Sequence, residues 1–208
     1  MNNDKRRLHA QSLLDYERSW RNSGTVAGMD EVGRGPLAGP VVTACVIIPD
    51  TPLLIWVDDS KKLSESRRER LYDEIISSAS AYSFGQVEAE EIDSVNILEA
   101  TKKAMREAAS RVPADFYLID AVSGLGLPGR EVPIIKGDAA SYSIAAASVI
   151  AKVRRDRLMR EMDELYPGYG FARNKGYGTA EHIAALKKLG PCPIHRKSFI
   201  GKILEGNL

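Results

Sequence analysis

Apolar and polar residues follow one another along the chain with two periods, one typical of strands and one typical of helices. Apolar or alternating runs predict strands at 25–31, 41–48, 82–88, 116–120 and 132–135. The first two predicted strands are joined by a tight loop, whereas the later ones interleave with predicted helices. This order favours an α/β fold with a central mixed sheet flanked by helices over a purely parallel sheet.

Helical spacing of apolar residues predicts the remaining elements. Helices are expected at 8–23, from Ser64 to about Ser80, at 141–165 and from Thr179 to Leu189. A further helix, capped by Asp93 or Ser94, is predicted to bury a stripe of residues that ends near Ala108. The helix at 141–165 is small and apolar in its first half and basic in its second, so we expect it to leave the core and emerge at the surface.

Composition indicates an ordinary globular protein. The 208 residues are 44% hydrophobic and 27% charged, and no stretch approaches the ~18 apolar residues of a membrane span. The two cysteines indicate no disulfide framework, and the N-terminus lacks the apolar segment of a signal peptide. We expect a cytoplasmic protein with no membrane association. Its predicted parts are a helical extension at 1–24, a catalytic domain at 25–190 and a tail at 191–208 that packs on the same domain.

Charge is distributed unevenly along the chain. Residues 1–111 contain 15 basic and 18 acidic side chains, whereas residues 112–208 contain 14 basic and 10 acidic ones. The C-terminal half is therefore the more probable nucleic-acid face, although the excess is small.

Four carboxylates lie where strands end or a helix begins. Asp30 and Glu31 end the first predicted strand, Asp120 ends the strand at 116–120, and Asp138 precedes the long helix. A single acid at such a place is usually a turn former or a cap. If the two strands are neighbours, however, the acids converge, and carboxylates without histidine suit Mg²⁺ or Mn²⁺ better than zinc.

A glycine-rich loop, Gly33-Arg34-Gly35, follows the first acidic pair directly. Backbone N–H groups and a guanidinium in such a loop can approach a phosphate. The glycines, with Asp58-Asp59 about 20 residues further on, also suggest a dinucleotide site. That motif requires a helix after the glycines. Because a β-branched run follows here, we reject the dinucleotide interpretation.

Two other segments carry groups that suit nucleic acid. Ser60, Lys61 and Lys62 lie in a loop that leads into a helix, where they either contact phosphates or form a solvated helix start. Tyr177 lies in a basic glycine-rich loop, where it either packs or contacts a sugar. Cys192 and His195 resemble half of a zinc site, but the chain offers no suitable second half.

Six segments together resemble one known family. They are Gly28–Val42, Asp59–Ser64, Glu91–Leu98, Leu118–Asp120, Lys136–Ser141 with Ile144–Lys152, and Tyr166–Thr179 with Gly190–Phe199. In this order they are similar to type 2 ribonuclease H, specifically to bacterial ribonuclease HII. The resemblance covers nearly all of residues 25–199 and implies a ribonuclease H-like fold with a small helical C-terminal part.

The resemblance also implies an activity and its residues. The expected reaction is endonucleolytic cleavage of RNA in RNA–DNA hybrids, with incision 5′ to single ribonucleotides in duplex DNA and 5′-phosphate and 3′-hydroxyl products. By the family pattern, Asp30, Glu31, Asp120 and Asp138 are the active-site acids that hold two Mg²⁺ or Mn²⁺ ions. Gly33, Arg34 and Gly35 would read the RNA–DNA junction, and Tyr177 would sense the 2′-hydroxyl. The enzyme is expected to be a monomer.

Two other function classes remain open at this stage. The chain could be a nucleic-acid-binding module whose acids only repel or cap. It could also be a resolvase-like or transposase-like nuclease that cuts duplex DNA without ribose. Incubation with a labelled hybrid, with and without Mg²⁺, separates these classes.

Overall fold

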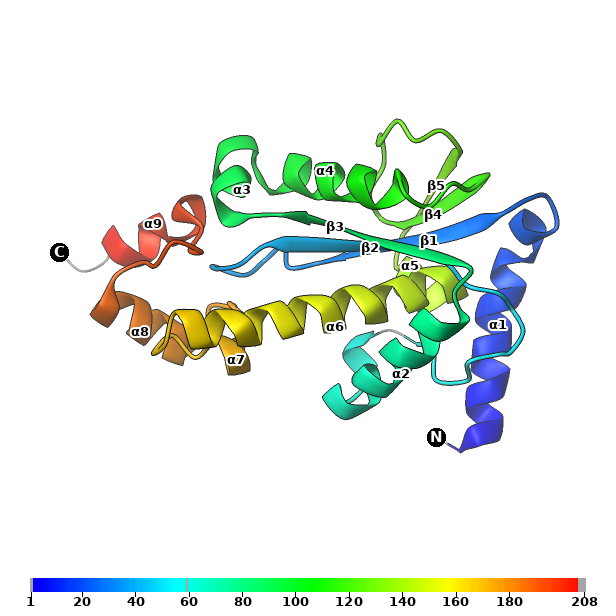
Figure 1. Ribbon diagram of the computed structural model, residues 1–208, viewed down its shortest axis with the longest axis horizontal. Helices are drawn as coiled ribbons and strands as arrows, with labels where there is room; N and C mark the ends of the chain where they lie inside the picture. Colours follow the sequence, from blue (N-terminus) through cyan, green and yellow to red (C-terminus); the bar gives the residue numbers. More distant parts are fainter. Residues whose placement is uncertain (1, 59, 206–208) are drawn as a thin grey trace.

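The computed structural model describes residues 2–58 and 60–205 of the chain and contains one five-stranded mixed sheet (Figure 1). Its strand order is β3-β2-β1-β4-β5, where β1 is Val26–Val32, β2 Val41–Ile47, β3 Ala81–Val87, β4 Phe116–Asp120 and β5 Arg130–Ile134. Strands β1, β2 and β3 pair antiparallel, whereas β1, β4 and β5 pair parallel. The predicted mixed sheet is confirmed.

Helices cover both faces of the sheet (Figure 1). One face carries α3 (Ala89–Val95) and α4 (Ile97–Ala109). The other is crossed by the long helix α6 (Tyr142–Leu165), which is flanked by α1 (Asn3–Arg21), α2 (Glu65–Ser78), the 3₁₀ turn η1 (Ser60–Lys62) and α5 (Gly137–Ala140). Three helices lie at the end opposite α1: α7 (Phe171–Asn174), α8 (Ala180–Leu189) and α9 (Lys197–Glu205). No helix in the described ranges is long and apolar enough to cross a membrane.

Close packing of α6 on β1 depends on Gly28. A Cβ atom at this position would lie 2.1 Å from the backbone carbonyl carbon of Ser143, so any larger residue would push the helix away. The buried alanines and aliphatic residues in the first half of α6 fill the layer beneath β1 and β2. Since a protein interior is close-packed, this contact fixes the helix relative to the strand that carries Asp30.

Helix α1 is joined to α6 by a buried carboxylate. Glu17 is fully buried and accepts hydrogen bonds from the backbone N–H of Ser143 at 2.6 Å and from its hydroxyl at 2.9 Å. Arg21 donates to the same carboxylate at 2.8 Å. An acid at the N-terminus of a helix satisfies free N–H groups and complements the helix dipole. The N-terminal helix therefore stabilises the start of α6.

Most predicted elements are confirmed, and one prediction is wrong. The expected helix capped by Asp93 or Ser94 is two helices, separated by Asn96, which has a φ of 71° and caps α4 by accepting from Leu98 N–H at 2.9 Å. Asp93 instead accepts from the backbone N–H of Lys197 and of Ser198 at the start of α9. Helix α6 runs from the core to the surface as predicted, since residues 142–151 are buried and Leu165 is exposed, but Arg155 in its basic half is fully buried. Asp59 lies outside the described residues, as do residues 206–208 of the predicted tail.

Candidate active site

Three aspartates from three elements meet at one end of the sheet. Asp30 lies on β1, Asp120 ends β4 and Asp138 lies in the short helix α5. Because β1 and β4 are parallel neighbours, their acids reach the same edge. Each aspartate contributes a carboxylate oxygen to a group whose members all lie within 4.8 Å of one another. Asp30 and Asp138 are each only 6% exposed.

Polar contacts orient the three carboxylates. Asp30 accepts from the backbone N–H of Glu31 at 2.7 Å and from the Ser148 hydroxyl, which also lies 2.9 Å from the Ser60 hydroxyl. Asp120 accepts from the backbone N–H of Gly137 at 2.8 Å.

Lys61 approaches the trio from the loop before α2. Its ammonium lies 3.1 Å from Asp138, and the lysine side chain is 80% exposed. One solvated lysine contributes little compensation for several buried negative charges.

Glu31 lies beside the trio, with its carboxylate only partly paired. One oxygen lies 3.3 Å from the Arg34 guanidinium. The other, Oε2, is buried and has no hydrogen-bond partner among the described residues. Of the four predicted acids, the structure thus gathers three and places the fourth next to them with a free acceptor.

Burial and nearby negative charges shift the pKa values of Asp30 and Glu31 upwards. Burial raises the pKa of Asp30 well above its usual value, and the negative charges of Glu31 and Asp120 raise it further. Burial also raises the pKa of Glu31, an effect that the neighbouring Arg34 opposes. Buried carboxylates of this kind are costly unless a cation meets them.

The donor set fits a divalent cation with oxygen ligands. The converging carboxylates include no histidine or cysteine, and Glu31 Oε2 supplies a further oxygen without a partner. Hard cations such as Mg²⁺ and Mn²⁺ prefer such ligands, whereas zinc favours nitrogen and sulfur. Asp30, Asp120 and Asp138, with Glu31 beside them, are the residues that would hold such ions.

Asp30, Glu31 and Asp120 line a pocket of about 170 Å³. Its lining includes Ser60, Lys61 and Tyr177, which the sequence had singled out, and also Ser148 and Lys152, which it had not. Lys62 does not line the pocket, and its ammonium pairs with Asp58 at 3.0 Å. In the sequence, Ser148 and Lys152 could have been found only from their spacing of four positions, which puts them on one face of the helix that begins shortly after Asp138.

The glycine loop follows β1 directly and lies beside Tyr177, which lines the pocket. A Cβ atom at Gly35 would have open space and would meet only the Tyr177 ring, at 4.0 Å. A Cβ atom at Gly33, where φ is 95°, would lie 2.3 Å from Arg155 Nε. Gly33 is therefore required by the fold of the loop, whereas Gly35 leaves a small exposed surface facing the tyrosine.

Two fully buried arginines support this loop from below. Arg155 donates to the carbonyls of Pro40, Lys175 and Ala38 at 2.9, 2.8 and 3.1 Å. Arg196 donates to the carbonyls of Gly33, Arg34 and Gly39 at 2.6–3.0 Å. Neither has a carboxylate within 4.0 Å in the described part of the chain. Both were missed, because an arginine in a basic segment usually has a solvated side chain.

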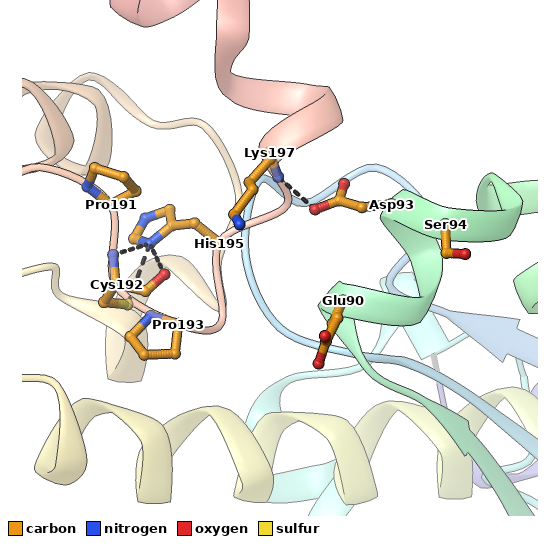
Figure 2. Close-up of a pocket in the computed structure, with 8 residues that line it drawn as sticks. All are labelled: Glu90, Asp93, Ser94, Pro191, Cys192, Pro193, His195 and Lys197. Carbon is orange, nitrogen blue, oxygen red and sulfur yellow. Dashed lines mark hydrogen bonds between the residues drawn. The ribbon is translucent and has the colours of Figure 1, made fainter.

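A larger cavity, of about 670 Å³, lies away from the acids (Figure 2). It separates α3 from the segment at 191–197, and its lining includes Glu90, Cys192 and His195. None of the predicted catalytic acids lines it. Its larger volume therefore does not make it the better candidate, since the buried acids of the smaller pocket carry the chemistry.

Comparison with known proteins gives one consistent result. The family model for ribonuclease HII matches residues 27–202. A ribonuclease HII from Caldanaerobacter subterraneus subsp. tengcongensis is 53% identical over 200 residues, covering 94% of this chain and 83% of the relative. One from Geobacter sulfurreducens is 56% identical over 194 residues, covering 91% and 89%. The crystal structure of ribonuclease H2 from Pyrococcus horikoshii superposes with a TM-score of 0.74 at 28% identity, covering 88% of this chain and 98% of that one.

Proposed function

The chain belongs to the ribonuclease HII family and is a metal-dependent endoribonuclease that acts on RNA–DNA hybrids, and we propose that it also incises duplex DNA 5′ to a single embedded ribonucleotide. The observation that carries this proposal is the shared pocket. The lining of this pocket contains Asp30, Glu31 and Asp120, and it also contains Tyr177. A scissile phosphate at the acids would thus place the adjoining sugar near an aromatic ring.

The residues have separable parts in the proposed reaction. Asp30, Asp120 and Asp138 would hold two Mg²⁺ or Mn²⁺ ions, with Glu31 supplying a further oxygen. When bound, such ions activate the attacking water and stabilise the leaving 3′-oxygen, which gives 5′-phosphate and 3′-hydroxyl ends. Ser148 orients Asp30, and Lys61 orients Asp138.

The loop and the tyrosine would supply recognition. Tyr177 is 41% exposed, so its ring is accessible to a sugar. We infer that it contacts the ribose 2′-hydroxyl and stacks on the next deoxyribose, while Gly33, Arg34 and Gly35 contact the backbone at the junction. Ser60 and Lys61 are suited to phosphate contacts at the pocket. Lys62 would take part only after releasing Asp58.

We further propose that the protein acts as a monomer in the cytoplasm. Cys45 and Cys192 are both free thiols, as expected in a reducing compartment. Sedimentation of the purified protein with and without hybrid tests the monomer, and a dimer that persists at nanomolar concentration would contradict it.

The test uses labelled duplexes that carry one or four ribonucleotides, with and without Mg²⁺. We expect Mg²⁺-dependent incision 5′ to the ribonucleotide by the wild-type chain. Asp30→Asn is expected to abolish cleavage but to retain duplex binding, because the amide cannot supply the charge that a divalent ion requires. Near-wild-type turnover by this variant would refute the assignment. Binding without cleavage by the wild type would favour a binding module, and cleavage of duplex DNA without ribose would favour a resolvase-like nuclease.

Tyr177→Ala tests the recognition half of the proposal. The variant should lose more activity on the single-ribonucleotide duplex than on a long hybrid, since the long hybrid offers alternative registers and contacts. Equal losses on both substrates would show that the tyrosine does not sense the junction.

A further inference from the structure

A chain of hydrogen bonds connects Tyr177 to the cavity that Figure 2 shows. The Tyr177 carbonyl lies 2.9 Å from His182 Nδ1, and His182 Nε2 lies 3.0 Å from His195 Nε2. At the far end, His195 Nδ1 lies 3.0 Å from the backbone N–H of Cys192, as the dashed lines in Figure 2 indicate. The two histidines are separated by 13 positions and come from α8 and from the segment before α9.

Only one placement of the protons satisfies every contact in this chain. The Tyr177 carbonyl can only accept, so the proton of His182 lies on Nδ1 and its Nε2 is an acceptor. His195 must then donate from Nε2, which leaves its Nδ1 free to accept from Cys192 N–H. The alternative partner of His195 Nδ1, the Cys192 carbonyl, is further away at 3.3 Å and already accepts from the His195 backbone N–H at 3.0 Å. Both rings are therefore neutral and of opposite tautomer.

The surroundings hold both rings in place. His182 is fully buried and His195 is 3% exposed. Tyr169 and Phe171 pack against them, with the Phe171 ring centroid 5.3 Å from that of His182 and 5.7 Å from that of His195. No carboxylate in the described ranges hydrogen bonds to either ring. Burial disfavours the charged imidazolium when no carboxylate lies nearby to compensate for its charge, so the neutral pair is the stable form.

The histidine pair contacts the backbone at the carbonyl of Tyr177, the tyrosine that lines the pocket. The Tyr177 carbonyl also accepts from the Thr179 N–H at 2.8 Å, and Thr179 caps α8. Next to His195 in sequence, Arg196 holds the carbonyls of the glycine loop. One dipeptide, His195-Arg196, thus supports both surfaces that face the substrate.

We propose that His182 and His195 are positioning residues for Tyr177, and that their fixed tautomers set the placement of the tyrosine over the acidic pocket and hence the preference for a ribonucleotide junction. This inference rests on the proposed function of the pocket. It assigns no contact with substrate to either histidine, because both are buried.

Two variants of His182, which lose ring packing to a similar extent, test the hydrogen bond that His182 Nδ1 donates to the Tyr177 carbonyl. In His182→Asn, the side-chain amide nitrogen can replace Nδ1 as donor to Tyr177, whereas His182→Gln places its amide at the Nε2 position and leaves the carbonyl without this donor. For His182→Gln, we expect kcat/KM on the single-ribonucleotide duplex to fall by roughly tenfold relative to the long hybrid. For His182→Asn, the ratio should remain within about threefold of wild type. Equal ratios for the two variants would overturn the proposal.

A double variant separates positioning from a general structural role. If His182 acts through the tyrosine, Tyr177→Ala combined with His182→Gln should show the same substrate ratio as Tyr177→Ala alone, because interacting sites are not additive. Independent, multiplied losses would show that the histidine acts elsewhere. If the wild type does not incise the duplex at a single ribonucleotide, the proposed function fails. If it does and His182→Gln leaves the ratio of the two activities unchanged, only this inference fails.

The wild-type protein gives a readout that does not depend on whether the variants fold. Nitrogen-15 spectra of the histidine rings at neutral pH should show His182 protonated at Nδ1 and His195 protonated at Nε2. The His195→Gln variant, which retains a donor at the Nε2 position, should leave the His182 tautomer unchanged. Finding the same tautomer at both residues, or a charged ring at neutral pH, would contradict the proposed chain of hydrogen bonds from Tyr177 to Cys192.

Discussion

Like charges are buried at two places near the same end of the sheet, and they are satisfied in opposite ways. The carboxylates of Asp30, Asp120 and Asp138 lie close together, and the adjacent Glu31 has an oxygen that finds no hydrogen-bond partner in residues 2–58 and 60–205. Within the same residues, the guanidinium groups of Arg155 and Arg196 donate to backbone carbonyls and to no carboxylate. The acidic pocket is poised to receive cations, whereas the arginine support is complete within the chain.

The difference separates chemistry from positioning. Groups that bind a ligand must leave part of their hydrogen-bonding or electrostatic capacity unused, and this costs stability in the free protein. Groups that position a loop do best when each polar atom has a partner, and every guanidinium nitrogen of Arg155 and Arg196 donates to at least one carbonyl. Substitutions in the two regions should therefore affect activity and stability in different proportions.

The largest effect on activity is expected from the acidic pocket. Asp120→Asn should lower cleavage by at least about a thousandfold, because it removes a charge that holds the divalent ions. The same change relieves repulsion with Asp30, so stability measured in chelator should be unchanged or higher. Thermal unfolding with increasing Mg²⁺ gives the control. The midpoint should rise for wild type and respond much less for the variant. A variant that is less stable in chelator would contradict the idea of an uncompensated acid cluster.

Arg196→Met should have the opposite balance of effects, with a large loss of stability as its primary consequence. It leaves the carbonyls of Gly33, Arg34 and Gly39 without their donor, so we expect a loss of about 3 kcal/mol in the free energy of unfolding. Arg196→Lys is the matched control. It keeps the charge, but a single ammonium cannot span three carbonyls, so it should recover only part of the loss. Denaturant unfolding of both variants measures the effect. Full recovery by lysine would show that charge, and not the hydrogen-bond geometry, is what matters.

A smaller effect is expected from the two glycines of the loop, Gly33 and Gly35, which are separated by one residue. Gly33→Ala places a methyl group against Arg155 at a positive φ and should cost about 2–3 kcal/mol of stability. The methyl group of Gly35→Ala would clash with no other residue that the structure describes, so the free energy of unfolding should stay within about 0.5 kcal/mol of wild type. The same methyl group should lower cleavage of the junction substrate, because it obstructs the approach of the substrate to Tyr177. Melting curves and cleavage rates for both variants decide the matter. Similar melting losses would show that Gly35 also serves the fold.

The acidic pocket was largely predictable from the sequence, whereas the support was not. Carboxylates that end apolar strands are a local signal, and only the pairing of β1 with β4 was needed to bring Asp30 and Asp120 together. The Asn96 break between α3 and α4 was missed, because the apolar stripe runs across it. That side chain caps α4 from a left-handed backbone conformation, which the periodicity does not report.

The support was missed because its contacts are distant in sequence and made to carbonyls. Arg155 meets Pro40, and Arg196 meets Gly33, across more than 100 residues. A carbonyl acceptor exists at every position, so no residue type signals it. The sequence offered Cys192 and His195 as a motif without a second half, and their partner His182 could be found only in three dimensions.

The smallest expected effect is the pH dependence that the histidine pair contributes to stability. Burial lowers the pKa of His182 and, together with the neighbouring His182, lowers the pKa of His195 to about 4. Since the unfolded value is near 6.5, the unfolded chain takes up the proton first, so stability is fully present above about pH 6.5 and is lost as the pH falls towards 4. The other titratable groups in contact with the rings, Tyr169 and Cys192, do not ionise in this window.

Carboxyl groups of the acidic pocket also titrate at low pH, so a matched pair of proteins is required to isolate the histidines. Unfolding should be followed from pH 7 to 4 in Asp30→Asn and in the same variant carrying His195→Gln. The first should lose on the order of 1–2 kcal/mol more than the second, because only the first must expel a proton from His195 on folding. Both proteins share all remaining acids, whose contributions therefore cancel in the difference. Parallel curves would show that His195 is charged or solvated in the folded protein, and would contradict a neutral, buried histidine pair.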